Sequence, residues 1–218
     1  MAEPVFTGVG VALATLFEDD GEVDLKATAD FAANLVDLGI RGVVVAGSTG
    51  EASALTRAAR EAGADAVLAL CPPRNNDPRP YYEAVAEAAG DLPVLAYHFP
   101  QTAPPGIPLD ALPDLPVQGM KDSTGDPERL LAELEVFHHP LYVGASSMLL
   151  MAGSLGLPGA ILAVANVDPE HAIAAFAGDP TAQQALLTAH RRVKSRFPFG
   201  LKDAIADRFN TSRATRLG

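Results

Sequence analysis

Seven short apolar runs recur along the chain, and a polar turn follows each of them. They occupy residues 9–15, 42–47, 66–71, 94–99, 117–121, 141–144 and 160–165. Most of these runs are continuous rather than alternating, which is typical of strands buried on both faces of a parallel sheet. The pattern therefore predicts seven parallel strands.

Alanine-rich segments with helical spacing lie between the apolar runs. They predict helices over 24–38, 81–89, 127–137, 146–155 and 169–177. In the first helix one stripe is expected to face the core, with Gly39 ending the helix. The residues of that stripe are Leu25, Ala29, Ala32, Ala33 and Val36. The dipeptides Asp126-Pro127 and Asp168-Pro169 are typical of an N-cap followed by proline at the first helical position.

Alternating strands and helices indicate an α/β fold with right-handed crossovers. An open dinucleotide-binding sheet is disfavoured because the first strand is followed by Leu16-Phe17-Glu18-Asp19-Asp20-Gly21 rather than by a Gly-x-Gly-x-x-Gly turn. In a (β/α) barrel the chemistry gathers where strands end, and the polar segments of this chain fall at such positions. We therefore expect residues 1–218 to form a single barrel domain.

The composition fits an acidic, cytoplasmic enzyme. The 218 residues are 48% hydrophobic, and the net charge of -11 argues against binding nucleic acid or an anionic membrane. Neither a signal peptide nor an apolar span of membrane length is visible, and the one cysteine, Cys71, fits a reducing compartment. With 12 Arg and 4 Lys, the acidic excess suggests either a high-salt cytoplasm or an ordinary acidic bacterial enzyme.

Lys121 is the most informative single residue. It ends an apolar run, whereas the other three lysines (Lys26, Lys194 and Lys202) lie in segments typical of helix surfaces. A lysine held in an apolar pocket has a lowered pKa, and its neutral amine attacks carbonyl carbon to form a Schiff base. The alternative is a strand-end lysine whose ammonium group reaches into water.

Two further strand ends carry candidate chemistry. Gly47-Ser48-Thr49-Gly50-Glu51 offers hydroxyl and backbone N–H groups to a carboxylate, or is simply a helix-capping turn. Tyr97 ends a strand and is either a proton relay or a core aromatic residue. The five histidines and Cys71 form no metal-ligand spacing, so neither a metal nor another cofactor is expected.

Together, these segments resemble the dihydrodipicolinate synthase and N-acetylneuraminate lyase family. The ordered segments 47–51, Tyr97-His98-Phe99-Pro100 and 119–126 are similar to its Gly-Thr-Thr-Gly-Glu, Tyr-Asn-x-Pro and Lys-Asp/Glu-x-x-Gly-Asp motifs. The similarity extends from about residue 5 to about residue 192. It implies a (β/α)₈ barrel fold and class I aldolase chemistry on pyruvate or a related keto acid, in a homo-oligomer.

The resemblance also implies a role for each matched residue. Lys121 is the Schiff-base lysine and Tyr97 the acid/base group. Ser48 and Thr49 bind the pyruvate carboxylate, and Gly144 and Ile161 line the same pocket.

Departures from the family pattern bear on the substrate. Synthase members that use aspartate semialdehyde carry an arginine where this chain has Thr102, and a tyrosine in the stretch that here reads Cys71-Pro72-Pro73-Arg74-Asn75. The pattern Tyr-x-x-Pro-x-Thr is nearer to the 2-keto-3-deoxygluconate aldolase branch. We therefore expect cleavage of 2-keto-3-deoxygluconate or its 6-phosphate, with 4-hydroxy-tetrahydrodipicolinate synthase and a keto-acid-binding pseudoenzyme as alternatives.

A length difference supports the last alternative. Fourteen residues separate Gly50 from Asp65, where the family has two helices and a strand. We therefore expect a barrel that is seven-stranded or open, lacking one βα unit after the second strand and the family's C-terminal helices. Strands left without a neighbour would need another cover for their backbone groups.

Overall fold

The computed structural model describes residues 3–18, 20–45 and 52–215. Within them the chain divides into two compact units. The first unit comprises residues 1–7 and 47–145, and the second comprises residues 8–46 and 146–218. The expectation of a single domain therefore stays a prediction.

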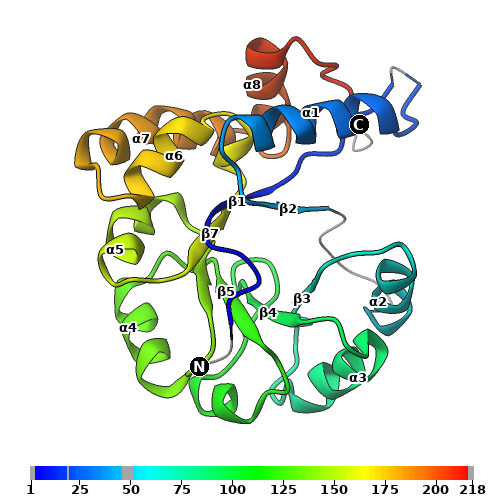
Figure 1. Cartoon of the computed structure of the whole chain (residues 1–218), viewed down its shortest axis with the longest axis vertical. Coiled ribbons are helices and arrows are strands. Elements are labelled where there is room, and N and C mark those ends of the chain that lie inside the picture. Colours follow the sequence, from blue (N-terminus) through cyan, green and yellow to red (C-terminus); the bar gives the residue numbers. More distant parts are fainter. Residues whose placement is uncertain (1–2, 19, 46–51, 216–218) are drawn as a thin grey trace. The chain divides into compact units, whose positions relative to one another are not determined.

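The first unit holds four parallel strands in the order β3-β4-β5-β6. These are β3 (Val67–Leu70), β4 (Val94–His98), β5 (Gly119–Asp122) and β6 (Leu141–Val143). Its helices are α2 (Ala52–Glu61), α3 (Arg79–Ala89), the 3₁₀ segment η1 (Leu109–Asp114) and α4 (Pro127–Val136). Figure 1 shows α2 beside α3 and the strands on the inner side of α3 and α4.

The second unit holds three parallel strands in the order β2-β1-β7. These are β1 (Gly8–Ala12), β2 (Gly42–Val44) and β7 (Gly159–Leu162). Its helical elements are α1 (Leu25–Asp37), η2 (Ser146–Met148), α5 (Leu149–Ser154), η3 (Val164–Asn166), α6 (Pro169–Phe176), α7 (Pro180–Lys194) and α8 (Phe199–Phe209). In Figure 1, α6 and α7 lie side by side and α8 lies next to α1.

All seven predicted strands occur, within a few residues of their expected limits. The described residues contain no eighth strand, and one helix, α2, fills the sequence between β2 and β3. In these ranges β2 pairs with β1 and β3 pairs with β4, each along one edge. The chain carries more helix at its end than expected, since α8 extends past Gly200.

The two predicted Asp-Pro caps are confirmed. Asp126 accepts hydrogen bonds from the backbone of Glu128 and Arg129 at the start of α4. Asp168 accepts one from His171 at the start of α6.

The predicted buried stripe of α1 is wrong. Leu25 is 77% exposed and Val36 is 50% exposed, whereas Phe31 and Leu35 are buried. Phe31 packs edge-on against Phe209 of α8, with ring centroids 5.1 Å apart. The large side chains at positions 31 and 35, one turn apart, determine the buried face, and the small alanines do not.

Candidate active site

Lys121 and Tyr97 lie side by side on the neighbouring strands β5 and β4. The two residues are in register, and Lys121 Nζ is 4.1 Å from the centroid of the Tyr97 ring. Paired residues of adjacent parallel strands point to the same face of a sheet. The first unit thus brings together two of the residues predicted to carry the chemistry.

The Lys121 amine is buried, with 5% of the residue exposed. Loss of water lowers its pKa to about 7, because the protein interior solvates the ammonium form poorly. Among the described residues no carboxylate forms an ion pair with it. The face of the Tyr97 ring attracts the ammonium form and opposes this shift. Near neutral pH a substantial fraction of Lys121 is therefore an uncharged nucleophile.

The Tyr97 hydroxyl accepts a hydrogen bond from Ser123 Oγ at 3.3 Å, which is long for a pair of hydroxyl groups. Burial raises the pKa of Tyr97, the Ser123 contact opposes that shift, and the charge of Asp122 adds to it. Tyr97 is consequently a protonated phenol at neutral pH. A group of this kind can give a proton to a substrate held above Lys121.

Helix α3 fixes the backbone on which Tyr97 stands. The buried hydroxyl of Tyr82 accepts from Tyr97 N at 3.3 Å and donates to Ala69 O at 3.0 Å. One side chain of α3 thus bridges the backbones of β3 and β4 directly behind the site.

Gly144 lets the side chains of Ser123 and Lys121 lie close against its backbone. Its backbone N donates to Asp122 O at 2.5 Å. A Cβ atom at Gly144 would lie 1.8 Å from Ser123 Oγ and 2.7 Å from Lys121 Cε. A side chain at this position would therefore displace Ser123 or Lys121.

Three further residues were predicted to belong to the site. Ser48 and Thr49 lie outside the described residues. Ile161 belongs to the second unit, where β7 pairs it with Gly10 of β1. Their roles stay predictions. Ser123, which the sequence interpretation did not select, contacts the site, and its place two residues after Lys121 was the signal available.

His98 lies next to Tyr97 in the chain but serves the neighbouring loop. Its Nδ1 accepts from Ile107 N at 2.8 Å. Burial and then the charge of Arg129 lower the pKa of His98 to about 3. A neutral imidazole accepting at Nδ1 carries its proton on Nε2. Across the described residues, no group of three or more His, Cys, Asp or Glu side chains is placed to hold a metal ion.

Lys202 corrects the expectation that three lysines lie on helix surfaces. It is 6% exposed on α8, its Nζ donates to Thr15 O, and it lies 4.8 Å from the centroid of the Phe17 ring. Burial lowers its pKa to about 8. The described residues thus contain two buried lysines, and Lys202, unlike Lys121, is bound to a backbone carbonyl group.

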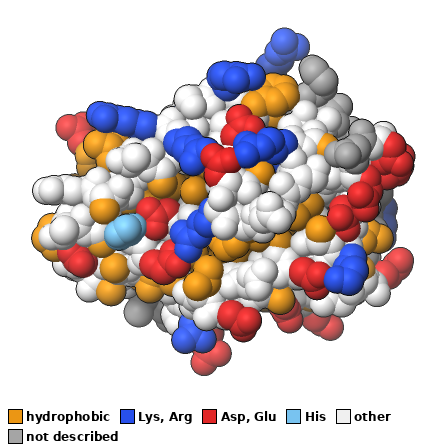
Figure 2. Space-filling model, turned by 90° about the horizontal axis from the view of Figure 1, so that it is seen from above, with side chains coloured by type: hydrophobic (Ala, Val, Ile, Leu, Met, Phe, Trp, Pro, Cys, Tyr) orange, Lys and Arg blue, Asp and Glu red, His pale blue; other side chains and the backbone are white. Residues whose placement is uncertain are grey.

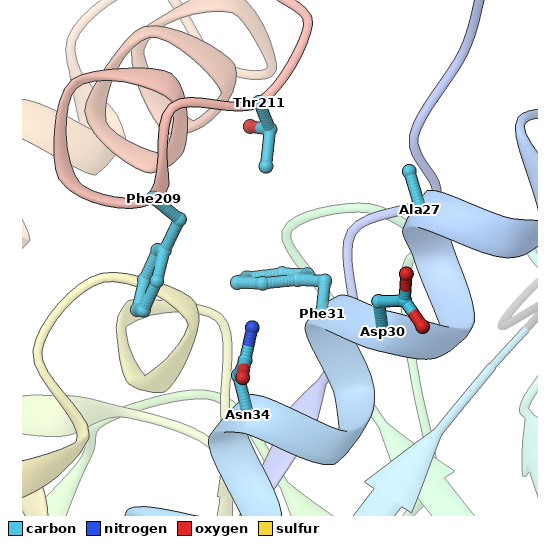
Figure 3. A pocket seen from close by; sticks show the side chains of 6 residues that line it. All are labelled: Ala27, Asp30, Phe31, Asn34, Phe209 and Thr211. Carbon is cyan, nitrogen blue, oxygen red and sulfur yellow. The ribbon is translucent and has the colours of Figure 1, made fainter.

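A small pocket in the second unit contains none of the predicted site residues. It holds about 170 Å³ between α1 and the end of α8, where the rings of Phe31 and Phe209 form a wall (Figure 3). Its one charged lining residue, Asp30, already pairs with Lys26 at 2.6 Å. The paired acid and the aromatic wall make this pocket a packing feature of the helices.

The chain matches the family model of the dihydrodipicolinate synthetase family over residues 5–58 and 51–193. The two matched pieces meet within the segment from which a βα unit was expected to be missing. Among curated relatives, the 4-hydroxy-tetrahydrodipicolinate synthase of Methanothermobacter thermautotrophicus is 26% identical, over 74% of this chain and 75% of its own. The synthase of Haloarcula marismortui is 27% identical, over 83% and 76% respectively.

A solved structure shares the fold. It is a prophage protein of the dihydrodipicolinic acid synthase family from E. coli K12, crystallised in complex with pyruvate. The TM-score is 0.85 at 22% identity, and the alignment covers 97% of this chain and 92% of that one. The chain thus has a TIM-type α/β barrel fold, of which the described residues provide seven strands. With the family model matched over most of its length, the chain belongs to the dihydrodipicolinate synthetase family, whose members are lyases and synthases of the class I aldolase type.

Proposed function

We propose that the protein is a Schiff-base aldolase that cleaves a 2-keto-3-deoxy sugar acid to pyruvate and an aldehyde. The substrate would be 2-keto-3-deoxygluconate or its 6-phosphate. The observation that carries this proposal is the buried Lys121 amine, without a carboxylate partner in the described residues, 4.1 Å from the Tyr97 ring. Such an amine reacts with carbonyl carbon at neutral pH.

In this mechanism the neutral Lys121 Nζ attacks the C2 carbonyl of the keto acid. Tyr97 gives its proton to the carbinol oxygen, and loss of water produces the imine. The protonated imine accepts the electron pair of the C3–C4 bond. The Tyr97 phenolate takes the proton of the C4 hydroxyl as the aldehyde leaves. Tyr97 passes that proton to C3 of the remaining enamine. Water then hydrolyses the protonated imine, which releases pyruvate, restores the neutral amine and returns a proton to Tyr97.

The other proposed residues bind rather than react. Ser48 and Thr49 would hold the carboxylate of the keto acid, since hydroxyl and backbone N–H groups suit an anion. Gly144 and Ile161 would line the pocket. The proposed ligand is a small keto acid. The homo-oligomeric state and the cytoplasmic location also stay predictions.

Two departures favour the sugar-acid substrate over aspartate semialdehyde. Thr102 is exposed in the turn after β4, and its N donates to Phe99 O at 3.0 Å. It places no positive charge where synthase members are expected to carry arginine. The stretch 71–75 contains no tyrosine either. Nevertheless, the names of relatives 26% and 27% identical favour 4-hydroxy-tetrahydrodipicolinate synthase as the second candidate.

The test is reduction of the protein with borohydride in the presence of pyruvate, followed by mass spectrometry of its peptides. We expect a pyruvate-sized adduct on Lys121 and none on Lys202. The trapping rate should rise with pH through about 7, because the neutral amine reacts. The matched control is Lys121→Arg, which keeps a cation but cannot form the imine.

The outcomes separate the candidates. Release of pyruvate from 2-keto-3-deoxygluconate supports the aldolase, whereas consumption of aspartate semialdehyde with pyruvate supports the synthase. A folded protein that forms no adduct would be a pseudoenzyme. An adduct confined to Lys202 would show that the wrong amine has been chosen.

A further inference from the structure

Two buried acids lie on the side of β5 away from Lys121. Asp122 follows Lys121 in the strand and is 4% exposed, and Glu133 of α4 is 0% exposed. Successive residues of a strand point to opposite faces, so the Asp122 carboxylate lies behind the site. Each of the two carboxyl groups contributes to the pKa shift of the other, so they act on each other directly. A hydrogen bond between two carboxyl groups forms only if one of them is protonated.

The remaining contacts identify which acid holds the proton. Both Asp122 oxygens already accept from Thr124, Oδ1 from its backbone N at 2.6 Å and Oδ2 from its hydroxyl at 2.7 Å. Glu133 Oε1 accepts from Arg129 Nε at 2.7 Å. Glu133 Oε2 is fully buried, and within the part of the chain that the structure describes it has no donor as its partner. A proton on Oε2 turns that unpaired acceptor into a donor toward Asp122.

Charge balance supports the same assignment. The charged groups that act on Glu133 are Asp122 from β5 and Arg129 from its own helix. From β4, His98 is neutral beside Arg129. The acids of the adjoining η1 segment, Asp110 and Asp114, are exposed. One arginine against two buried carboxylates leaves an excess negative charge, and one proton removes it.

The pair also closes a ring of contacts around the end of β5. Asp122 binds Thr124, and Thr124 Oγ1 accepts from the backbone N of Asp126 at 3.2 Å. Asp126 caps α4, and α4 carries Glu133, on whose pKa the charge of Asp122 acts. Ser123, between Asp122 and Thr124, donates to the Tyr97 hydroxyl. The conformation of this turn therefore determines how Ser123 and Tyr97 lie against Lys121.

We propose that Glu133 carries a proton in the native protein, donates it to Asp122, and through that bond positions the turn that holds Ser123, Tyr97 and Lys121 together. Glu133 is a positioning residue, and its effect on catalysis rests on the proposed aldolase function. Burial and then the charge of Asp122 raise the pKa of Glu133 to about 8. Above that pH two negative charges face each other behind Lys121, and the turn loosens.

The sign of the stability effect follows from that pKa. Between about pH 5 and about pH 7 the native state holds a proton on Glu133 that the unfolded chain has released. Rising pH therefore destabilises the native state, and this group raises the unfolding constant up to about tenfold per pH unit. Lys121 is mostly protonated in both states at the acidic end of this window. Near about pH 7 the native state loses that proton, which opposes the effect of Glu133 and is common to native protein and Glu133 variants.

The test compares the full-length protein with Glu133→Gln. Glutamine keeps a donor toward Asp122 and an acceptor for Arg129 but cannot lose a proton. We expect the protonated-carboxyl infrared band of the native protein to be lost in the variant. We also expect the unfolding constant of the variant to rise less steeply with pH. The difference in slope should correspond to about one proton. The His98 contribution is common to both proteins and cancels. Equal bands and equal slopes would overturn the proposal.

The effect of Glu133 on the position of the site can be measured at Lys121 itself, without an activity assay. The chain has four lysines, so ¹³Cε-labelled lysine gives four signals that single lysine variants assign. In the native protein the Lys121 signal should shift in two steps, its own near about pH 7 and a second near about pH 8 as Glu133 ionises. Glu133→Gln should leave the first step alone. One step in both proteins, or two in both, would refute the positioning role.

Activity adds a last comparison. If pyruvate is trapped, the rate should fall above about pH 8 in the native protein and stay level in Glu133→Gln. Identical profiles in the two proteins would overturn the positioning role. If neither folded protein traps pyruvate, the proposed function fails, and the infrared, stability and lysine signals still decide the role of Glu133.

Discussion

At the scale of single residues, the site depends on burial acting in opposite directions on two kinds of group. Lys121 loses water and its pKa falls, which frees the amine for attack. Glu133 loses water and its pKa rises, so that it stays protonated and can donate a hydrogen bond to Asp122. Lys121 and Asp122, the partner of Glu133, are consecutive in β5. One short strand thus separates an uncharged nucleophile from a proton-sharing acid pair.

Gly144→Ala should abolish most of the reactivity of Lys121. The new methyl group would lie 1.8 Å from Ser123 Oγ and 2.7 Å from Lys121 Cε, so one or both must move. A displacement of about 1 Å at a reacting centre costs about 100-fold in rate. The measurement is the rate of pyruvate trapping by borohydride at saturating pyruvate.

Gly63→Ala is the matched control within the same unit. Gly63 has a φ of +83°, and no atom of the described residues lies within 4 Å of an added Cβ. Alanine there should cost about 1 kcal/mol of stability through backbone strain, with trapping unchanged. Equal trapping rates for Gly144→Ala and the native protein would mean that the close packing at Gly144 does not control the reactivity of Lys121.

The sequence predicted the residues that belong to motifs and missed those that depend on packing. Lys121 and Tyr97 were selected by their places at strand ends and Gly144 by the family resemblance, and the first unit brings them together. Glu133 and Lys202 were not selected, because a charged residue on a helix is exposed in most proteins. Whether such a charged residue is buried depends on which neighbouring element covers it. The local sequence pattern does not contain that information.

At the scale of elements, the strands were easier to predict than the helices. Each strand is a continuous apolar run, a signal that does not depend on its neighbours. Helix α7 was missed because its sequence, Pro180–Lys194, is largely polar and buries three side chains, Ala182, Leu186 and Val193. The buried face of α1 was misassigned because alanines offer several equivalent stripes.

Helix α4 is the element on which the site depends most, since it carries Glu133 and Arg129 and begins at the Asp126 cap. Asp126→Ala should destabilise the protein by about 1 kcal/mol, because two backbone N–H groups lose their acceptor. Urea unfolding measures the loss. Asp126→Asn should restore most of it, because an amide oxygen also accepts these hydrogen bonds.

Asp179→Ala provides the comparison in the second unit. Asp179 caps α7 with the same two contacts, to Thr181 N and Ala182 N. Both alanine variants should lose similar stability, but the Lys121 signal should shift in Asp126→Ala alone, since α4 holds Glu133. A shift of that signal in both variants would mean that the cap acts on the whole protein and not through α4.

At the scale of the whole molecule, the strands and the net charge of this chain differ from those of a complete eight-stranded barrel of moderate charge. Strand β2 is three residues long; Val43 within it is 38% exposed, and Val45 directly after it is 64% exposed. A short strand leaves few unpaired backbone groups at an edge, which reduces the risk of pairing with another chain.

Among the described residues, no helix is both long and apolar enough to cross a membrane.

Charge is the second such feature. Figure 2 shows acidic and basic side chains next to each other on one face. Ion pairs of this kind join Arg213 to Asp203 and Asp207 around α8. The net charge of -11 nevertheless leaves many carboxylates without a cation. The mutual repulsion of these carboxylates destabilises the compact state, and salt weakens this repulsion.

Glu83 and Glu87 make this repulsion measurable. Both are exposed on α3, four residues apart, where like charges destabilise a helix. Glu87→Lys replaces the repulsion with an attraction in the favourable order, Glu before Lys. We expect it to stabilise the protein by about 0.5 kcal/mol in about 0.05 M NaCl. Urea is the denaturant to use, because guanidinium chloride is itself a salt.

In about 1 M NaCl the Debye length falls to about 3 Å, and the advantage of Glu87→Lys should largely disappear while the native protein gains stability. Glu87→Gln removes the repulsion without adding an attraction, so its stability at low salt should lie between the other two. An advantage of the same size at both salt concentrations would point to helix propensity instead of charge. If the native protein gains no stability with salt, its carboxylates do not limit folding, and the acidic composition is that of an ordinary enzyme rather than one adapted to a high-salt cytoplasm.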